Sequence, residues 1–411
     1  MFLLLTTRRN IIRNLTKSLL TVVVGALIVL LLNIYIGNIN SGQNQLNDLA
    51  DALTIRADIS NVNGSQITAL RIKDDIVKSL ESSTHVEGLK YTIELTGGFG
   101  TFSPEEWRKH LSINISAVNT LTAIPGLDEA NITFIAGLNA SIMHTKQAVC
   151  LLTEDFSERN DIKLGDTIQC TLYYYVYPSS EYEMFMINPL GFFDLTVAGV
   201  IGEMIWEGGD YISPDVVLPI DWVRSAYDQI DASFYPTNAS FAVADPLRLD
   251  EFKAEMQSFD LMETLPTANF SHNGSALIVG DKIFIEAASH LRENLRLLGF
   301  FLPFILAIVV FVGYLTSYLL MQNRRREFAV MRSLGTGQKT CFYTFMCETS
   351  VLSLSGGLLG SFVAVLIIQS AVIGVLFLSA GMFFVCYILG TAAALYGLGR
   401  FSVIDVLCQA D

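Results

Sequence analysis

The residue types that most often carry chemistry are present in this chain but are not spaced for it. Its six cysteines contain no C-x-x-C pair and its five histidines contain no H-E-x-x-H motif, so the sequence does not indicate a zinc site. It also lacks the G-x-S-x-G sequence of a nucleophile elbow. The segment Gly335–Thr340 lacks the Gly-Lys pair and the preceding strand of a phosphate-binding loop. We therefore predict a non-catalytic chain whose energy source is another polypeptide.

Two cysteines, Cys150 and Cys170, lie in the acidic middle of the chain. They could form a disulfide, or they could be two small buried strand residues. The other four lie in or near the apolar segments described below: Cys341, Cys347, Cys386 and Cys408.

A short basic segment, residues 322–341, has the most informative pattern. Its cations are Arg324, Arg325, Arg326, Arg332 and Lys339, and its one acid is Glu327. Phe328, Met331 and Leu334 recur at i, i+3 and i+6, which indicates a short amphipathic helix, and Gly335 follows as a stop. Basic loops beside membrane spans stay in the cytoplasm. We predict a cytoplasmic helix that docks on a soluble protein. The alternative, that the arginines only fix topology, accounts for the charge but not for the apolar stripe.

Composition indicates a membrane protein with an exported domain. The 411 residues are 51% hydrophobic and only 16% charged, with a mean hydropathy of +0.45. Residues 38–296 have a net charge of −20, whereas the remainder has +6. Because basic residues mark the cytoplasmic side, the acidic part is expected outside and both termini inside. Its acidity also argues against nucleic acid as a partner.

Four apolar segments are long enough to span a bilayer. We expect a cytoplasmic N-terminus at residues 1–17, spans at 18–37, 299–321, 342–369 and 376–398, a cytoplasmic loop at 322–341 and a cytoplasmic tail at 399–411. A cleavable signal peptide is the alternative for the first span, but the residues after it are a poor cleavage site.

Residues 38–298 are predicted to form one extracytoplasmic domain with two lobes. The first lobe, about 52–98 and 237–286, has two strand–helix–strand patterns: 52–60, 67–80 and 88–95, then 239–244, 249–259 and 276–285. The inserted lobe, about 100–235, contains strand-like segments at 134–152, 166–176 and 193–201. We expect a discontinuous α/β lobe with a β-rich insert.

The basic segment also carries a family resemblance. Residues 324–335, RRREFAVMRSLG, resemble the first cytoplasmic loop of the FtsX/MacB superfamily of ABC transporter permeases. In that family the next span has an early Glu and a Gly-Gly-x-x-Gly step, which are similar to Glu348 and to Gly356, Gly357 and Gly360 here. Residues 164–168 and 193–200 are similar to a Gly-Asp turn and a strand of MacB-type domains. The tail, 401–407, lacks the family's proline.

This resemblance implies a function without catalysis. The chain would be the four-span permease subunit of a MacB-like system in a bacterial cytoplasmic membrane. A separate cytoplasmic ABC ATPase, binding ATP and Mg, would move the external domain by mechanotransmission to export or extract a peptide, lipid or lipoprotein. The alternative is an FtsX-like transducer that regulates an external cell-wall hydrolase.

The resemblance also implies residue roles and partners. Coupling to the ATPase would fall to Arg324, Arg325, Arg326, Glu327, Phe328, Met331, Arg332, Leu334 and Gly335. Gly356, Gly357 and Gly360 would allow close helix packing, either within one subunit or across a dimer with the same or a paralogous permease. Glu348 could reach the membrane interface or make a buried polar contact. No cofactor is expected on this chain. Membrane lipids and an external adaptor or hydrolase complete the expected partners.

Overall fold

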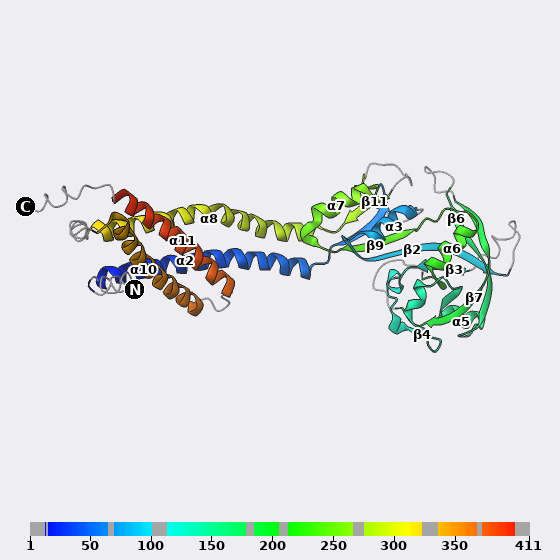
Figure 1. Ribbon diagram of the computed structural model, residues 1–411. Helices are drawn as coiled ribbons and strands as arrows, with labels where there is room; N and C mark the ends of the chain where they lie inside the picture. Colours follow the sequence, from blue (N-terminus) through cyan, green and yellow to red (C-terminus); the bar gives the residue numbers. More distant parts are fainter. Residues whose placement is uncertain are drawn as a thin grey trace, which may run out of the picture. The chain divides into compact units, whose positions relative to one another are not determined.

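The computed structural model describes residues 13, 15–64, 70–100, 113–177, 185–204, 213–265, 275–322, 336–367 and 372–398. The chain divides into two compact units, Met1–Leu49 with Glu286–Asp411, and Ala50–Ile285. We call the first the helical unit and the second the extramembrane unit. Long helices make up the described part of the first, and the second is built on a β-sheet (Figure 1). The predicted fold class, four apolar helices with an α+β domain, is confirmed.

Four helices are long and apolar enough to cross a membrane. They are α2 (Leu15–Ala52), α8 (Lys282–Gln322), α10 (Gln338–Ile367) and α11 (Ile373–Leu398). Each contains most of one predicted span. Their apolar stretches carry few charges, which is what allows a helix with all its backbone groups paired internally to sit in hydrocarbon.

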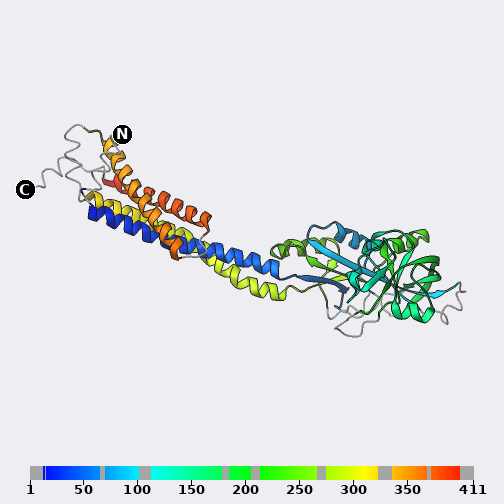
Figure 2. The same cartoon turned by 90° about the horizontal axis from the view of Figure 1, so that it is seen from below.

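Helices α2 and α8 run side by side within the helical unit (Figures 1 and 2). The Tyr35 hydroxyl on α2 donates a hydrogen bond to the Leu298 carbonyl of α8 over 2.5 Å. Further along the same two helices, a methyl group on Gly42 of α2 would lie 2.9 Å from the Leu295 side chain of α8. The two helices therefore contact each other beyond the predicted ends of both spans.

The structure corrects the prediction of a strand over residues 276–285. Strand β11 (Ser275–Val279) ends before Gly280, and α8 begins at Lys282. The Ile285 N–H already donates to the Asp281 carbonyl, which is the first turn of the helix. The apolar residues at 283 and 285 resemble strand alternation, but they belong to a helix that continues into the second apolar segment.

All described strands of the extramembrane unit belong to one sheet of eleven strands. They are β1 (Arg56–Asn61), β2 (Val86–Phe99), β3 (Ile113–Val118), β4 (Ile132–Phe134), β5 (Val149–Thr153), β6 (Thr167–Val176), β7 (Met186–Ile201), β8 (Val216–Pro219), β9 (Asn238–Val243), β10 (Leu261–Met262) and β11. The helices are α3 (Asp74–Ser82), α5 (Glu154–Asn160), α6 (Ile220–Gln229) and α7 (Leu249–Ser258), with 3₁₀ turns at Leu121–Ala123, Glu129–Asn131, Ala140–His144 and Pro246–Arg248.

One part of the sheet joins the early and late segments of the unit. Strand β1 lies between β11 and β9 and is antiparallel to both, so Ala57 faces Val279 on one side and Phe241 on the other. Helices α3 and α7 bury one apolar face each, and the Phe252 ring of α7 lies 6.1 Å from the ring of Phe241. The segments 52–98 and 237–286 therefore contribute to the same sheet, with helix α3 shorter than the predicted 67–80.

The rest of the sheet closes on itself. Strands β2, β3, β8, β5, β7 and β6 pair in that order, and β6 pairs back to β2. Because the ring is closed, each of these six strands pairs with a neighbour on both sides. Of the predicted strand-like segment 134–152, only the two ends are strand: β4 ends at Phe134, and β5 begins at Val149 after a 3₁₀ turn.

Strand β2 is shared by both parts of the sheet. Along one edge it pairs first with β9, up to Thr92 opposite Asn238, and then with β6, from Leu95 opposite Tyr174. Along its other edge it pairs with β3. The two predicted lobes are thus not separated by a break in the sheet, and the exchange of neighbours falls at residues 93–94.

Candidate functional site

The predicted coupling residues, 324–335, lie outside the described residues. The helices at either end of this segment are described: α8 ends at Gln322 and α10 begins at Gln338. Met321 of α8, Phe345 of α10 and Leu395 of α11 form a buried apolar cluster close to these ends. A displacement of the segment would therefore act on helix ends that are already packed against one another.

Glu348 of α10 lies one helical turn beyond this cluster. Its side chain is 1% exposed within the helical unit. This burial favours the buried polar contact over a carboxylate at the membrane interface. A charged group at such a position is costly unless it is paired, and intramembrane carboxylates usually mark structural or functional contacts.

The three predicted packing glycines of α10 differ in their surroundings. A methyl group on Gly356 would lie 2.9 Å from the Val22 carbonyl oxygen, and one on Gly360 would lie 2.5 Å from that of Ala26. Both contacts are with the backbone of α2 in the same chain. A methyl group on Gly357 would only approach the Phe383 ring at 4.0 Å. Gly356 and Gly360 therefore allow α10 and α2 to approach closely, as small residues do in membrane helices.

A second close crossing, between α8 and α11, was not predicted. A methyl group on Gly313 of α8 would lie 2.8 Å from the Tyr387 carbonyl oxygen, and Gly390 of α11 faces the Val310 carbonyl in the same way. Ser317 and Thr391 share a hydrogen bond of 2.8 Å across the same crossing. The small residues at these positions are visible in the sequence, but the sequence does not show which distant helix each of them contacts.

Hydrogen bonds also link the first and last spans. The Ser379 hydroxyl of α11 donates to the Asn33 side-chain oxygen of α2 over 2.6 Å, and the Asn33 amide donates to the Val29 carbonyl over 2.9 Å. Asn33 is 1% exposed and Ser379 is fully buried. A buried amide in an apolar span requires such partners because its polar groups would otherwise be unsatisfied.

Cys150 and Cys170 are free thiols in the structure. Cys150 on β5 pairs with Val197 of β7, whereas Cys170 on β6 pairs with Phe193 on the opposite edge of β7. Two strand spacings around a closed ring amount to roughly 8–10 Å, more than the Cα separation that a disulfide spans. The disulfide is therefore not formed, and the alternative of two buried strand residues holds.

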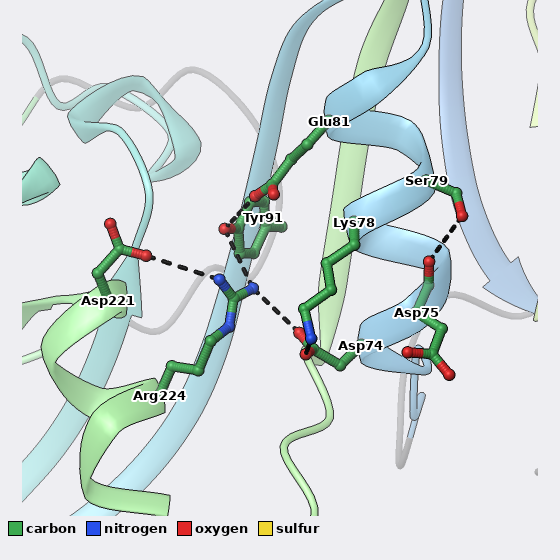
Figure 3. Close-up of polar contacts among 8 residues, drawn as sticks. All are labelled: Asp74, Asp75, Lys78, Ser79, Glu81, Tyr91, Asp221 and Arg224. Carbon is green, nitrogen blue, oxygen red and sulfur yellow. Dashed lines mark hydrogen bonds and ion pairs between the residues drawn. The ribbon is translucent and has the colours of Figure 1, made fainter. Parts of the chain in front are cut away.

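The extramembrane unit contains a polar cluster centred on Arg224 of α6 (Figure 3). Its guanidinium lies 3.0 Å from Asp74 of α3 and 3.6 Å from Asp221, and donates to the Tyr91 hydroxyl over 3.4 Å. Tyr91 in turn donates to Glu81 over 2.7 Å. Burial, and then the Glu81 carboxylate, raise the pKa of Tyr91 well above its usual range, so this hydroxyl remains a donor at neutral pH. The cluster joins helices that belong to different parts of the sheet.

A cavity of about 740 Å³ opens where β2 exchanges neighbours. Glu94 of β2 and Arg71 line it together with several aromatic rings: Tyr174, Tyr175, Tyr177, Phe185 and Tyr235. Burial raises the pKa of the Glu94 carboxyl. The volume lies within the range of small-molecule sites. Among the described residues, no group of three or more metal-ligating side chains could hold a metal ion.

Neither the Arg224 cluster nor this cavity was predicted from sequence. Asp74 and Arg224 are ordinary charges on amphipathic helices, and Glu94 reads as the polar residue of an alternating strand. The tyrosine-rich run 173–175 was a visible signal for an aromatic surface, although nothing local shows which carboxylate faces it.

Part of the helical unit matches a known family model. Residues 299–403 match the family model of the FtsX-like permease C-terminal domain. This range includes most of the second span, the basic loop and the last two spans, and it confirms the resemblance predicted from the loop. No curated protein matches the chain.

Two of the similar solved structures are extramembrane domains. The periplasmic region of MacB from Actinobacillus actinomycetemcomitans is 13% identical, with a TM-score of 0.31, over 56% of this chain and 92% of that one. The extracellular domain of the ABC-type transporter YknZ from Gram-positive bacteria is 8% identical, with a TM-score of 0.30, over 54% of this chain and 99% of that one.

Proposed function

We propose that this multi-pass membrane protein, which carries an FtsX-like permease C-terminal domain at residues 299–403, is the permease subunit of a MacB-like ABC transporter. In this proposal a separate cytoplasmic ATPase binds ATP and Mg, and this chain passes the resulting motion to its external unit. The observation that carries the proposal is the basic amphipathic segment 324–335 inside the matched domain.

The residue pattern of this segment suits docking on a soluble motor. Phe328, Met331 and Leu334 form one apolar stripe at helical spacing, the arrangement by which a helix binds in a groove. The arginines would hold the segment in the cytoplasm and form the rim of the contact. The 411 residues carry no phosphate-binding loop, and the proposal therefore places the motor on a separate polypeptide.

The packing of the helical unit supports transmission from this segment. Helix α8 ends at Gln322, just before the segment, and it runs as one helix from Lys282, which follows strand β11 in the chain. Its contacts with α2 at Tyr35–Leu298 and with α11 at Ser317–Thr391 link it to two further helices. In this proposal a displacement of the segment passes along α8 toward the extramembrane unit.

The experiment is co-purification of the ATPase with variants of the segment. Met331→Asp or Leu334→Asp should abolish both ATPase binding and function in cells while membrane insertion is retained, because a buried anchor typically contributes on the order of 2 kcal/mol or more. Arg325→Ala is the matched control and should bind nearly as well, since two neighbouring arginines remain. Full ATPase binding by the aspartate variants would show that the segment only anchors topology.

A further inference from the structure

The cavity beside β2 places the carboxylate of Glu94 among aromatic rings. Among the described residues, no lysine or arginine lies within ion-pair distance of Glu94. Arg71, the cation that also lines the cavity, stacks on the Tyr235 ring at 4.3 Å and donates to the Tyr177 carbonyl over 3.4 Å. It is therefore engaged elsewhere.

The position of Glu94 follows from the sheet. Its backbone lies between the last residue that pairs with β9 and the first that pairs with β6, and its N–H donates to the Thr237 hydroxyl over 3.2 Å. Glu94 is opposite Ser116 of β3, so both side chains stand on the same face and both line the cavity. The rigid ring of strands therefore holds the carboxylate on the floor of the cavity.

Aromatic side chains surround this floor. The Phe185 ring contacts Tyr175 edge-on at 5.4 Å and Tyr177 at 6.2 Å, so the three rings form one cluster. Rings next to a carboxylate attract a cation through their negative faces, and this attraction grows when the site is partly shielded from water. Water has access to Glu94, but the surrounding protein desolvates the group enough to raise its pKa.

We propose that this cavity binds an organic cation, an ammonium or guanidinium group carried on an apolar body. The carboxylate of Glu94 would pair with the cation, and the rings of Tyr175, Tyr177 and Phe185 would contact the cation and the apolar body. The negative charge of the whole external segment, −20 over residues 38–296, favours the approach of cations and disfavours anions.

The surroundings of Glu94 favour a ligand of opposite charge. A carboxyl whose pKa is raised in the folded state destabilises the fold once the pH rises through that pKa. Burial raises the pKa of Glu94, and among the described residues no lysine or arginine pairs with the ionised carboxylate to offset this. A bound cation would supply the missing partner. This inference concerns the external unit alone and goes beyond the proposed coupling, because binding in the cavity can be measured without an ATPase.

The test uses the full chain in lipid nanodiscs and short soluble probes. Acetyl-Phe-Lys-amide should bind, while its neutral match acetyl-Phe-norleucine-amide and its anionic match acetyl-Phe-Glu-amide should not compete with it. Glu94→Gln should weaken binding by about 10-fold to 100-fold, the usual range for losing one charged hydrogen-bonding partner. The control Glu87→Gln changes a carboxylate of the same strand that does not line the cavity, and it should bind as the unchanged protein does.

Two further arms make the result decisive. Phosphoethanolamine, a lipid headgroup that also carries an ammonium group, serves as a second probe. Tighter binding of acetyl-Phe-Lys-amide would indicate a peptide ligand, and tighter binding of phosphoethanolamine would indicate a lipid headgroup. The thermal midpoint of Glu94→Gln should be unchanged or higher, so that lost binding cannot be attributed to unfolding. Equal binding by the protein and Glu94→Gln, or equal competition by the norleucine probe, would overturn the proposal. Failure of ATPase co-purification would leave this result unaffected.

Discussion

The guanidinium of Arg224 on α6 lies 3.0 Å from the carboxylate of Asp74 on α3, and both side chains are mostly buried, 19% and 22% exposed. The pair connects α3, on the part of the sheet built from the early and late segments of the unit, to α6, on the closed ring of strands. Because the two residues are far apart in the chain, their contact forms only when the unit has its tertiary structure.

Removing Arg224 should destabilise the extramembrane unit. Arg224→Met would leave Asp74 and Asp221 without their shared cation, at a cost of about 1–3 kcal/mol for groups that keep some access to water. The matched control is Arg248→Met, whose pair with Glu251 is more than half exposed and should contribute little to stability. Unfolding of the purified protein, followed by heat or denaturant, measures both. Equal midpoints for the two variants would contradict the structural role of Arg224.

Close packing of α10 on α2 should make Gly360 intolerant of larger residues. Gly360→Leu would place atoms where the Ala26 carbonyl lies, and overpacking of this kind costs about 1–3 kcal/mol. Gly357→Ala should be tolerated, because its added methyl group has room and alanine favours helix. The yield of monodisperse protein in detergent and its unfolding temperature distinguish them. A tolerated leucine at 360 would show that α10 does not pack there.

The two buried thiols should be unreactive in the folded protein. Burial raises the pKa of Cys170 to about 12, and raises that of Cys150 further, so almost no thiolate forms at pH 8. Maleimide should label both residues only after denaturation, as mass spectrometry of the digested protein would show. Labelling of the folded protein at either site, or a non-reduced peptide joining the two cysteines, would refute the register of β5 and β6 on β7.

The orientation of the chain in the membrane can be tested at two positions. A cysteine introduced by Asn139→Cys should react with an impermeant maleimide in intact cells, because the acidic segment is expected outside. One introduced by Gln338→Cys should react only after lysis, because it lies at the start of α10, beside the basic segment expected in the cytoplasm. Mass spectrometry identifies the labelled site among the native cysteines. Reaction of both positions from outside would exclude the proposed four-span topology.

Local patterns in the sequence predicted the elements better than their pairing. The length of the apolar segments predicted the four spans, and alternating residues predicted strands near β1 and β9. Such predictions work because burial of one face, or of a whole segment, depends on residues that are neighbours in the sequence. The strand predicted up to residue 285 failed because Ile283 and Ile285 alternate at the start of a helix.

What could not be predicted depends on contacts between distant residues. The closure of β6 onto β2 and the ion pair of Arg224 with Asp74 each join segments with no common local signal. The same is true of Glu94, which is distinctive only because the fold places it beside rings of β6 and the ring of Phe185, which precedes β7. The packing glycines of α10 were visible as small residues, but their partner helix was not.

The position of β1 has a consequence for how the protein is made. Ala57 emerges early from the ribosome, yet its two neighbours in the sheet, Phe241 and Val279, are among the last residues of the unit to be synthesised. Long-range pairing of this kind is slow, and unpaired strands are prone to associate wrongly while they wait. Strand β11 is followed directly by α8. The nascent chain therefore cannot complete its sheet until its second apolar helix is already leaving the ribosome, which ties maturation of this unit to membrane insertion.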